Sequence, residues 1–456
     1  MRRFTFDRLA TYLLFLSIAT AACLMPAQSD TFWQLRAGQE MVATGRVLLV
    51  DTFTHTVRGA YWPNHEWLSQ IVFYFLHVSG GMPLLTAFAA ALVVLSWACA
   101  WRLMQGSVVL RLALVLVLVA PSARLWSLRP QLVSLLLLGV TCLLLHMGRT
   151  RWIPLLFLGW ANFHGGVMLG LAALGGALVG AVWIDRTRAK SAALTLTASA
   201  AAVCITPLGL SVWTEIPQML RRLDAYGVSE WQPASLTDPS NLPFWGAALV
   251  LITLVVRCRR SLDVDSAAMA GAALALLPMA IQSSRNVTPF LLVAGPPLSR
   301  LLPLVIAWSA QRRRRERYGF NLGFAGASTI ACVAVVVIAW MRPLERLNWT
   351  PVPTNVARQV SSCRGNLYNL YDNGGYLVWF VPEKPVFMDS RQDPFPMELV
   401  SAQISAERTG DYARLFEGHH VHCAALPPES RVARQLTARG WRTRAADARW
   451  LVLTSD

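Results

Sequence analysis

Four residues that could do acid–base chemistry, Asp30, Asp51, His65 and Glu66, stand in the polar stretch that follows the first apolar run of the chain. Asp30 comes directly after that run, Asp51 lies further along, and His65 and Glu66 are adjacent. A carboxylate can accept a proton from an attacking hydroxyl group, and histidine titrates near neutral pH. We therefore expect Asp30 to act as a base or to orient an acceptor, with the other three as further acid–base or cation-binding groups.

Five other residues have side chains that could bind a substrate at the same predicted membrane face. Arg129 and Arg285 each stand at the end of an apolar run, and an arginine fork suits a phosphate or diphosphate. His164 precedes two glycines between two short apolar runs and would line a cleft. Trp33 and Trp231 could stack on a sugar ring or anchor the chain at the membrane interface.

Each candidate also has a structural explanation. Asp30 could cap a helix or end a span, and His65–Glu66 could cap an apolar helix over residues 67–79, which would lie against the membrane. His164 could be a hydrogen-bonded packing residue, Arg285 a headgroup anchor and Trp231 an interfacial anchor. The collection of all these residues at one face favours a functional site.

The elements that position these residues are predicted to be membrane-spanning helices. Hydrophobic residues make up 55% of the 456 residues and charged residues only 14%, against roughly 25% charged in soluble proteins. This composition excludes a soluble enzyme, a disordered protein and a disulfide scaffold. We predict eleven spans, at 9–26, 82–101, 108–122, 130–147, 152–163, 165–184, 191–207, 242–257, 264–282, 288–307 and 321–341.

The positions of the basic residues predict the orientation. Arginines are more frequent in the loops that are cytoplasmic if the N-terminus is cytoplasmic, including the run over 312–317. The net charge of +16 thus belongs to loops and does not indicate nucleic-acid binding. Only Lys190 and Lys384 are lysines among 41 basic residues, which is typical of a GC-rich bacterial genome. We predict a multi-pass protein of the bacterial inner membrane with an uncleaved first span.

The chain divides into a membrane domain over 1–341, with a large first outer loop at 27–66, and an extracytoplasmic domain over 342–456. The second domain is predicted to be a small α/β domain, with strands at 386–388 and 421–426 and helices at 397–407 and 429–439. Gly374 and Gly375 read as a turn. Cys363 and Cys423 both fall in this domain, where an oxidising periplasm would permit a disulfide.

This arrangement resembles the GT-C superfamily of polytopic membrane glycosyltransferases, such as protein O-mannosyltransferases and aminoarabinose transferases. In that superfamily an acidic residue just after the first span begins a large outer loop and serves as catalytic base or cation ligand, and Asp30 occupies that place. The sequence departs from the family pattern in two motifs: Thr31 follows Asp30 where a second acid is common, and His65-Glu66-Trp67-Leu68 replaces a Pro-Pro-Leu segment.

The resemblance implies a mainly α fold and an enzyme that moves a sugar from a polyprenyl-phosphate donor to a lipid, glycan or protein acceptor. A divalent cation is the one cofactor that the carboxylates would suit, and no metal-binding motif is present. Two other functions remain open from the sequence: a non-catalytic membrane scaffold of envelope assembly, and a lipid or solute transporter. The absence of a charged residue well inside a predicted span and of an internal repeat counts against the transporter.

Overall fold

The structure is a computed structural model that describes residues 4–222, 229–306, 316–341 and 345–455. Residues 312–315 of the predicted cytoplasmic arginine run lie outside this part of the chain. The contacts divide the chain into two compact units. The helical unit comprises Met1–Met25, Pro83–Gly209 and Val228–Leu344, and the mixed unit comprises Pro26–Met82, Leu210–Gly227 and Glu345–Asp456.

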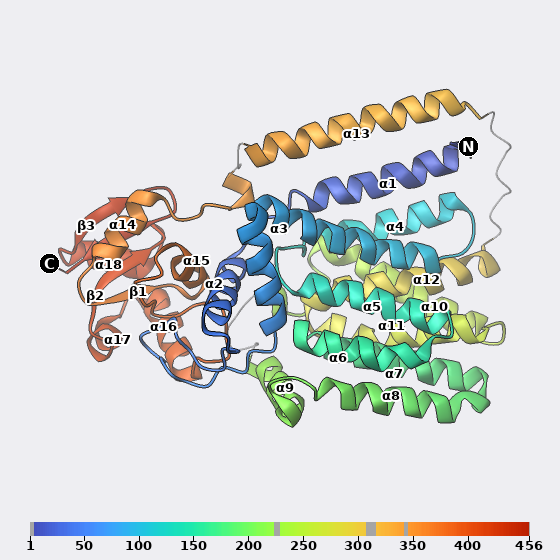
Figure 1. The fold of residues 1–456 in the computed structure, drawn as a ribbon, viewed down its shortest axis with the longest axis horizontal. Coiled ribbons are helices and arrows are strands. Elements are labelled where there is room, and N and C mark those ends of the chain that lie inside the picture. The colour runs from blue at the N-terminus through green and yellow to red at the C-terminus, as the bar shows by residue number, and fades with distance from the viewer. Residues whose placement is uncertain (1–3, 223–228, 307–315, 342–344, 456) are drawn as a thin grey trace. The chain divides into compact units, whose positions relative to one another are not determined.

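The helical unit consists of long apolar helices that lie side by side with roughly aligned axes (Figure 1). Each of the eleven predicted spans falls on one of these helices. Their bounds are α1 Phe6–Ala22, α3 Trp67–Leu103, of which this unit holds the second part, α4 Val108–Ala123, α5 Gln131–His146, α6 Ile153–Phe163, α7 Val167–Ile184, α8 Ala189–Val203, α10 Leu242–Cys258, α11 Val264–Gln282, α12 Val287–Val305 and α13 Tyr318–Met341.

Among the described residues, six helical segments are long and apolar enough to cross a membrane. They contain α3, α7, α10, α11, α12 and α13, while α4 and α5 are shorter apolar helices. The chain is thus a multi-pass membrane protein, and the count of eleven crossings stays a prediction.

Small residues allow the closest helix contact in the helical unit, between α7 and α11. A Cβ atom on Gly180 would lie 2.1 Å from the carbonyl oxygen of Ala267, and one on Gly176 would lie 2.3 Å from that of Gly271. No side chain fits at either glycine. Such close approach is how membrane helices associate where both partners are already apolar.

The mixed unit joins the predicted first outer loop to the C-terminal segment. Its four-stranded sheet has the order β1-β2-β4-β3, in which β1 and β2 are parallel and the other pairs antiparallel. Its elements are α2 Ser29–Thr44, the first part of α3, α9 Val212–Arg222, α14 Thr354–Ser362, β1 Asn366–Asn369, α15 Tyr371–Phe380, α16 Met397–Thr409, α17 Ala413–Gly418, β2 Val421–Leu426, α18 Arg431–Ala438, β3 Arg442–Ala446 and β4 Leu451–Thr454.

One hydrophobic core is shared by the loop and the tail. Trp33, Met41 and Trp62 come from the first outer loop, and they pack in the same buried cluster as Val378 and Trp450 of the tail. The backbone N–H of Gly375 in α15 donates to the hydroxyl group of Ser29 in α2, at 3.0 Å. The burial of these side chains therefore depends on both stretches of sequence.

The structure confirms the strand at 421–426 and places helices at both predicted helical segments of the tail. Residues 386–388 do not form a strand, although Val386 makes one isolated parallel bridge with Thr54. The disulfide between Cys363 and Cys423 is present, with Cα atoms 6.0 Å apart. It links the end of α14 to strand β2.

The prediction of a turn at Gly374–Gly375 is wrong. Both glycines lie inside α15 and are buried. A Cβ atom on Gly374 would lie 2.0 Å from the carbonyl oxygen of Met388, and one on Gly375 would lie 2.3 Å from that of Ser29. The glycines serve close packing of the helix on its neighbours, and this tertiary requirement overrides their low helix propensity.

The apolar helix predicted over 67–79 is the first part of α3. Helix α3 is interrupted at Gly80 and Gly81, whose dihedral angles are not helical. Gly81 has φ 64° and ψ −163°, a conformation that is essentially restricted to glycine. The break lies just before Pro83, where the segment of α3 in the helical unit begins.

Candidate functional site

Asp30 lies in the first turn of α2, a helix separate from the first span. The Oδ1 atom of Asp30 accepts a hydrogen bond from the Ser390 hydroxyl group. The Trp33 indole Nε1–H lies 3.3 Å from the same oxygen and 3.2 Å from the Ser390 hydroxyl. A helix N-terminus stabilises a carboxylate through the aligned peptide dipoles. Asp30 is half-buried, so its carboxylate is held in place but still reaches the surface.

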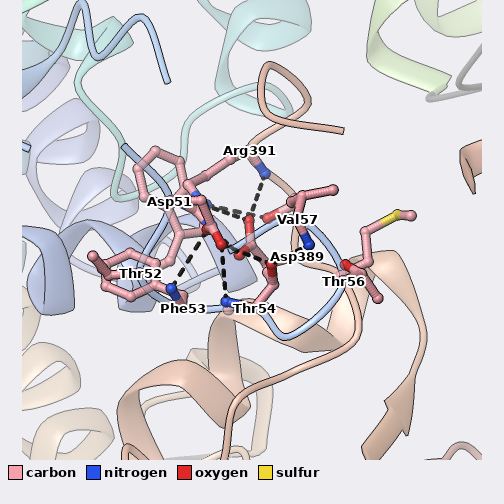
Figure 2. Close-up of polar contacts among 12 residues, drawn as sticks. Asp51, Thr52, Phe53, Thr54, Thr56, Val57, Asp389 and Arg391 are labelled. Carbon is pink, nitrogen blue, oxygen red and sulfur yellow. Dashed lines mark hydrogen bonds and ion pairs between the residues drawn. The ribbon is translucent and has the colours of Figure 1, made fainter. Parts of the chain in front are cut away.

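Ser390 is positioned by an ion network formed by its two neighbours and the first loop. The Arg391 guanidinium group donates to Asp389, with Nε–Oδ1 at 2.8 Å and Nη2–Oδ2 at 2.7 Å. It also pairs with Asp51. Figure 2 shows these three side chains pointing toward one another, and all three are buried. The network fixes the backbone on both sides of Ser390 and so fixes the group that contacts Asp30.

The Arg391 guanidinium also lies against two aromatic rings, 4.5 Å from the centre of Phe53 and 4.6 Å from that of Trp62. Burial acts to lower the pKa of Arg391, but Asp389 and Asp51 raise it above its ordinary value. Burial also raises the pKa of the Asp389 carboxyl group, and the charge of Asp51 adds to this effect. The guanidinium therefore stays charged between two carboxylates.

The contacts of Asp51 differ from those expected of a catalytic acid or base. Its carboxylate accepts from the Thr54 hydroxyl at 2.7 Å and from the Thr54 backbone N–H at 3.2 Å, in addition to Arg391. The side chain is fully enclosed. These contacts hold the loop against the tail, and the acid–base role expected of Asp51 stays a prediction.

Glu66 lies beside α2 through a contact with Gln34, which stands one helical turn after Asp30. The Gln34 Nε2 atom donates to Glu66 Oε2 at 2.9 Å. The His65 Nε2 atom is 3.6 Å from Glu66 Oε1, while Nδ1 is 3.1 Å from the Pro63 carbonyl oxygen. We call Asp30, Trp33, Gln34, Glu66 and Ser390 the α2 cluster.

The carboxylates of the α2 cluster are the oxygen ligands to consider for a divalent cation. Hard cations bind several oxygen ligands at short range. In the described ranges, no three His, Cys, Asp or Glu side chains are grouped closely enough to hold a metal ion. The α2 cluster offers groups for proton transfer and hydrogen bonding, and the divalent cation suggested by the sequence stays a prediction.

A second cluster lies in the helical unit and contains both predicted phosphate-binding arginines. Arg129 forms a bidentate pair with Glu230, with nitrogen–oxygen distances of 2.9 and 2.6 Å. Arg285 lies 3.4 Å from the same carboxylate and 4.7 Å from the centre of the Trp231 ring. Burial alone would raise the pKa of Glu230, but the two guanidinium groups outweigh it and lower the pKa to about 2. We call Arg129, Glu230, Trp231 and Arg285 the arginine cluster.

His164 ends α6 and takes part in a hydrogen-bonded chain with two neighbouring helices. The Trp160 Nε1–H donates to the Ser134 hydroxyl at 2.6 Å, and that hydroxyl lies 2.7 Å from His164 Nδ1. The Gly166 backbone N–H donates to the same Nδ1 at 2.9 Å. A Cβ atom on Gly166 would lie 2.5 Å from the Ser134 hydroxyl oxygen, so only glycine fits there.

A small pocket in the helical unit brings His164 and the arginine cluster together. Its volume is about 60 Å³. Glu230, Arg285 and His164 contribute to its walls, and leucines of α5 form much of the remainder. The structure thus gathers the predicted residues into two groups: Asp30, Trp33 and Glu66 with His65 in the mixed unit, and Arg129, His164, Trp231 and Arg285 in the helical unit.

Several residues of these groups had no predicted role. Ser390, Asp389 and Arg391 form a polar triplet directly after the apolar segment 386–388, and that abrupt change was the one local signal for them. Gln34 follows Asp30 at a spacing of four, which places both on one face of a helix. The sequence hides this signal because its polar character predicts a loop, and not a helix, over residues 27–66.

No family model matches this sequence, and no curated protein matches it either. Solved structures of the oligosaccharyltransferase AglB from the archaeon Archaeoglobus fulgidus do match the fold. One of these structures is a complex with an inhibitory peptide and a dolichol-phosphate, and another is the apo form. Each matches with a TM-score of 0.55 and 12% sequence identity. The match covers 91% of this chain and 69% of the enzyme. A third structure, tethered to an acceptor peptide, matches with a TM-score of 0.54 and 13% identity, and the match covers the same shares of the two chains. The chain therefore has a fold similar to that of this membrane-bound oligosaccharyltransferase.

Proposed function

We propose that this protein is a membrane glycosyltransferase that moves a sugar from a polyprenyl-phosphate-linked donor to an extracytoplasmic acceptor. The observation that carries the proposal is the Asp30 carboxylate at the start of α2, held by Ser390 and Trp33. A glycosyltransferase of this type needs a fixed carboxylate to receive a proton, and this one occurs on a fold similar to that of an oligosaccharyltransferase.

In the proposed reaction, Asp30 accepts the proton of the acceptor nucleophile. The nucleophile forms a bond to the anomeric carbon of the sugar, and the bond from that carbon to the donor phosphate oxygen breaks. The electron pair of that bond leaves on the lipid phosphate. Glu66 contacts Gln34, which follows Asp30 on α2, so we assign His65 and Glu66 to proton transfer after the step at Asp30.

The arginine cluster is proposed to attract the donor phosphate. It contains two guanidinium groups and one carboxylate, which Arg129 holds bidentately. The cluster therefore has an excess of one positive charge. Arg285 makes the longer contact with Glu230, so it is the arginine better placed to turn toward an anion.

An apolar groove supports the assignment of a lipid-linked donor. The groove has a volume of about 530 Å³ and is lined by side chains of α3, α5 and α6, including Phe88 and Leu92, and by Trp152 just before α6. It shares Trp160 with the pocket that Arg285 and His164 line. A ligand with a polar head and an isoprenoid tail matches this adjacency of a polar pocket and an apolar groove.

The acceptor and the orientation are also proposals. AglB is described with a dolichol-phosphate and with an acceptor peptide, so a lipid-linked donor and a peptide acceptor are the first pair to test, ahead of lipid and glycan acceptors. The disulfide of the mixed unit fits an oxidising compartment. It supports a periplasmic location for that unit, in a bacterial inner membrane with a cytoplasmic N-terminus.

The test is sugar transfer by the purified full-length chain from a panel of polyprenyl-phosphate sugars, comparing wild type with Asp30→Asn. The matched control is Asp7→Asn, which alters a carboxylate in the first turn of α1. We expect transfer by wild type and by the control, and a loss of about 100-fold or more in Asp30→Asn. Full activity of Asp30→Asn would remove the role of Asp30, and no transfer from any donor would overturn the proposed function.

A further inference from the structure

Three residues that line the pocket of the helical unit carry polar atoms without a hydrogen-bond partner among the described residues. They are the indole Nε1 of Trp126, the side-chain oxygen of Gln131 and the hydroxyl of Thr288. The side chains of Trp126 and Thr288 are more than nine-tenths buried. A buried polar group without a partner is costly, and native proteins almost always satisfy such groups. Three of them around one pocket point to a ligand that brings their partners.

The orientation of the Gln131 amide is set by its other contacts. Its Nε2 atom donates to the carbonyl oxygen of Leu125 at 3.1 Å and to the Ser127 hydroxyl at 3.2 Å. The Leu125 carbonyl can only accept, so the amide nitrogen must face it. The group of Gln131 that lacks a partner is therefore an acceptor, while that of Trp126 is a donor.

The protonation state of His164 follows from Gly166. A backbone N–H can only donate, and that of Gly166 donates to His164 Nδ1 at 2.9 Å. Nδ1 therefore carries a lone pair, and the ring proton is on Nε2. A second proton at Nδ1 would break this bond and the contact with Ser134. His164, which lines the pocket, is thus a neutral hydrogen-bond donor and not a proton acceptor.

The pocket therefore combines donors with acceptors. Trp126 and His164 supply N–H donors, Gln131 supplies an acceptor, and the Thr288 hydroxyl can do either. A phosphate diester offers only acceptors, so it would leave the Gln131 oxygen without a donor. Hydroxyl groups both donate and accept, so a hydroxylated ligand satisfies the whole set.

The size and the apolar walls narrow the ligand further. One water needs roughly 10–15 Å³ of such space, so a pocket of about 60 Å³ holds about five waters. A space of this size admits the hydroxylated edge of one sugar ring and excludes an oligosaccharide. Leucines 132, 135, 138 and 169 line the pocket together with the indoles of Trp126 and Trp160, and these apolar surfaces suit the C–H face of a pyranose.

We propose that this pocket binds a single sugar ring, recognised by the Trp126 indole N–H, the Gln131 side-chain oxygen, the Thr288 hydroxyl and the neutral His164 ring. The inference rests on the proposed function for the source of the sugar, which is either the lipid-linked donor or a glycan acceptor. The recognition itself is a property of the pocket.

The experiment is ligand-observed NMR of methyl hexosides and methyl N-acetylhexosaminides binding to the full-length chain. The protein is held in amphipol, because maltoside detergents carry the ligand chemistry themselves. Trp126→Phe and Thr288→Val remove one polar group each with little change in shape. Each is expected to weaken binding by about threefold to tenfold, the effect of one lost neutral hydrogen bond.

Two matched controls exist in the same unit. Trp245→Phe removes an indole N–H, and Thr86→Val removes a hydroxyl, from residues that also lack partners in the described structure but are not among those that line the pocket. Unchanged binding in both controls, with losses in Trp126→Phe and Thr288→Val, is the expected result. Equal losses in all four variants, or no binding of any glycoside by wild type, would overturn the proposal.

A competition arm identifies the source of the sugar. Displacement of the methyl glycoside by a polyprenyl-phosphate sugar assigns the pocket to the donor, and displacement by a free glycan alone assigns it to the acceptor. Displacement by inorganic phosphate or by sugar-free polyprenyl phosphate would overturn the proposal. Glycoside binding in a protein that shows no transfer would keep the pocket assignment and overturn only the proposed enzymatic activity.

Discussion

Arg391 and Asp51 are 340 residues apart in the sequence, yet their side chains form an ion pair from which solvent is fully excluded. Asp389 completes the network from the other side of the guanidinium. The network ties residues of the first loop to the tail, and Ser390, the residue between Asp389 and Arg391, contacts Asp30. A structural ion network and a candidate catalytic carboxylate are thus connected through one residue.

Removal of Arg391 should destabilise the mixed unit severely. Arg391→Ala leaves two buried carboxylates without their cation, and breaking a buried pair from one side costs about 3–5 kcal/mol of unfolding free energy. The triple variant Arg391→Met, Asp389→Asn and Asp51→Asn removes all the charges and should cost less than Arg391→Ala alone. Thermal unfolding of the full-length chain in detergent measures both, with the exposed Arg414→Ala as control. A loss in Arg391→Ala no larger than in the control would contradict the buried network.

Ser390 should act on transfer through Asp30. Ser390→Ala removes the hydroxyl donor to the carboxylate, and a hydrogen bond to a charged group is worth about 1.5–3 kcal/mol. We expect a fall in kcat of about tenfold or more, with the exposed Ser362→Ala unaffected. In the Asp30→Asn background the same change should have little further effect, because the two residues act as a unit. Additive losses in the double-mutant cycle would show instead that Ser390 contributes only to folding.

Glu230 should make the stability of the helical unit depend on acid pH. Its pKa in the folded protein is about 2, below the ordinary value of 4.5. A lowered carboxyl pKa stabilises the folded state above pH 4.5, and this contribution is lost as the pH falls from 4.5 toward 2. At 1.36 kcal/mol per pKa unit, the contribution at neutral pH is about 3 kcal/mol.

Glu230→Gln should therefore lower stability at pH 7 and flatten its dependence on pH between 4.5 and 2. Unfolding midpoints of wild type and variant across this range provide the measurement, and the exposed Glu398→Gln is the control. An unchanged pH dependence in Glu230→Gln would mean that the two arginines do not hold this carboxylate in the folded protein.

The disulfide between Cys363 and Cys423 should be a large stabilising term in the mixed unit. The cysteines are 60 residues apart, and closing a loop of that length is worth about 4 kcal/mol in the chain-entropy model. Replacement of both cysteines by serine should lower the unfolding midpoint, while Cys332→Ser, at a free cysteine, should not. Labelling of all eight cysteines without reduction would show that the bond is absent.

Gly375→Ala should disrupt the contact between α15 and α2. The added methyl group would meet the Ser29 carbonyl oxygen at 2.3 Å, so one of the helices must shift. Overpacking of this kind costs about 1–3 kcal/mol or more. Gly418→Ala, at a glycine with no atom near the position of a Cβ, is the control. Equal stability of the two variants would contradict the tight seating of α15.

The features that the sequence predicts well are local ones. An apolar run of sufficient length must become a helix in a membrane, because every backbone polar group has to be satisfied within the segment. The helices of the helical unit could therefore be placed from composition alone. The position of Asp30 at the start of the segment after the first apolar run could also be inferred, while its catalytic role stays a prediction.

The features that the sequence did not predict depend on distant partners. The pairing of Asp51 with Arg391 leaves no local signal, so the sequence does not show that this carboxylate is buried in an ion network. The neutral state of His164 depends on the geometry of Gly166, and the helical state of Gly374 and Gly375 depends on the neighbours that they contact. In each case tertiary packing determines which of several possible structural roles the residue has.

The seating of α15 on α2 has a consequence for how this protein can change in evolution. Residues 345–456 look like a portable module because they follow the last apolar run. Excised alone, they would leave Leu377, Val378 and Trp450 without Trp33 and Trp62, and they would leave Arg391 without Asp51. Such a fragment would expose apolar surface and an ion network with one carboxylate missing. Recombination can therefore exchange this tail between relatives only together with the segment that follows the first helix, so the two stretches must be inherited as one unit.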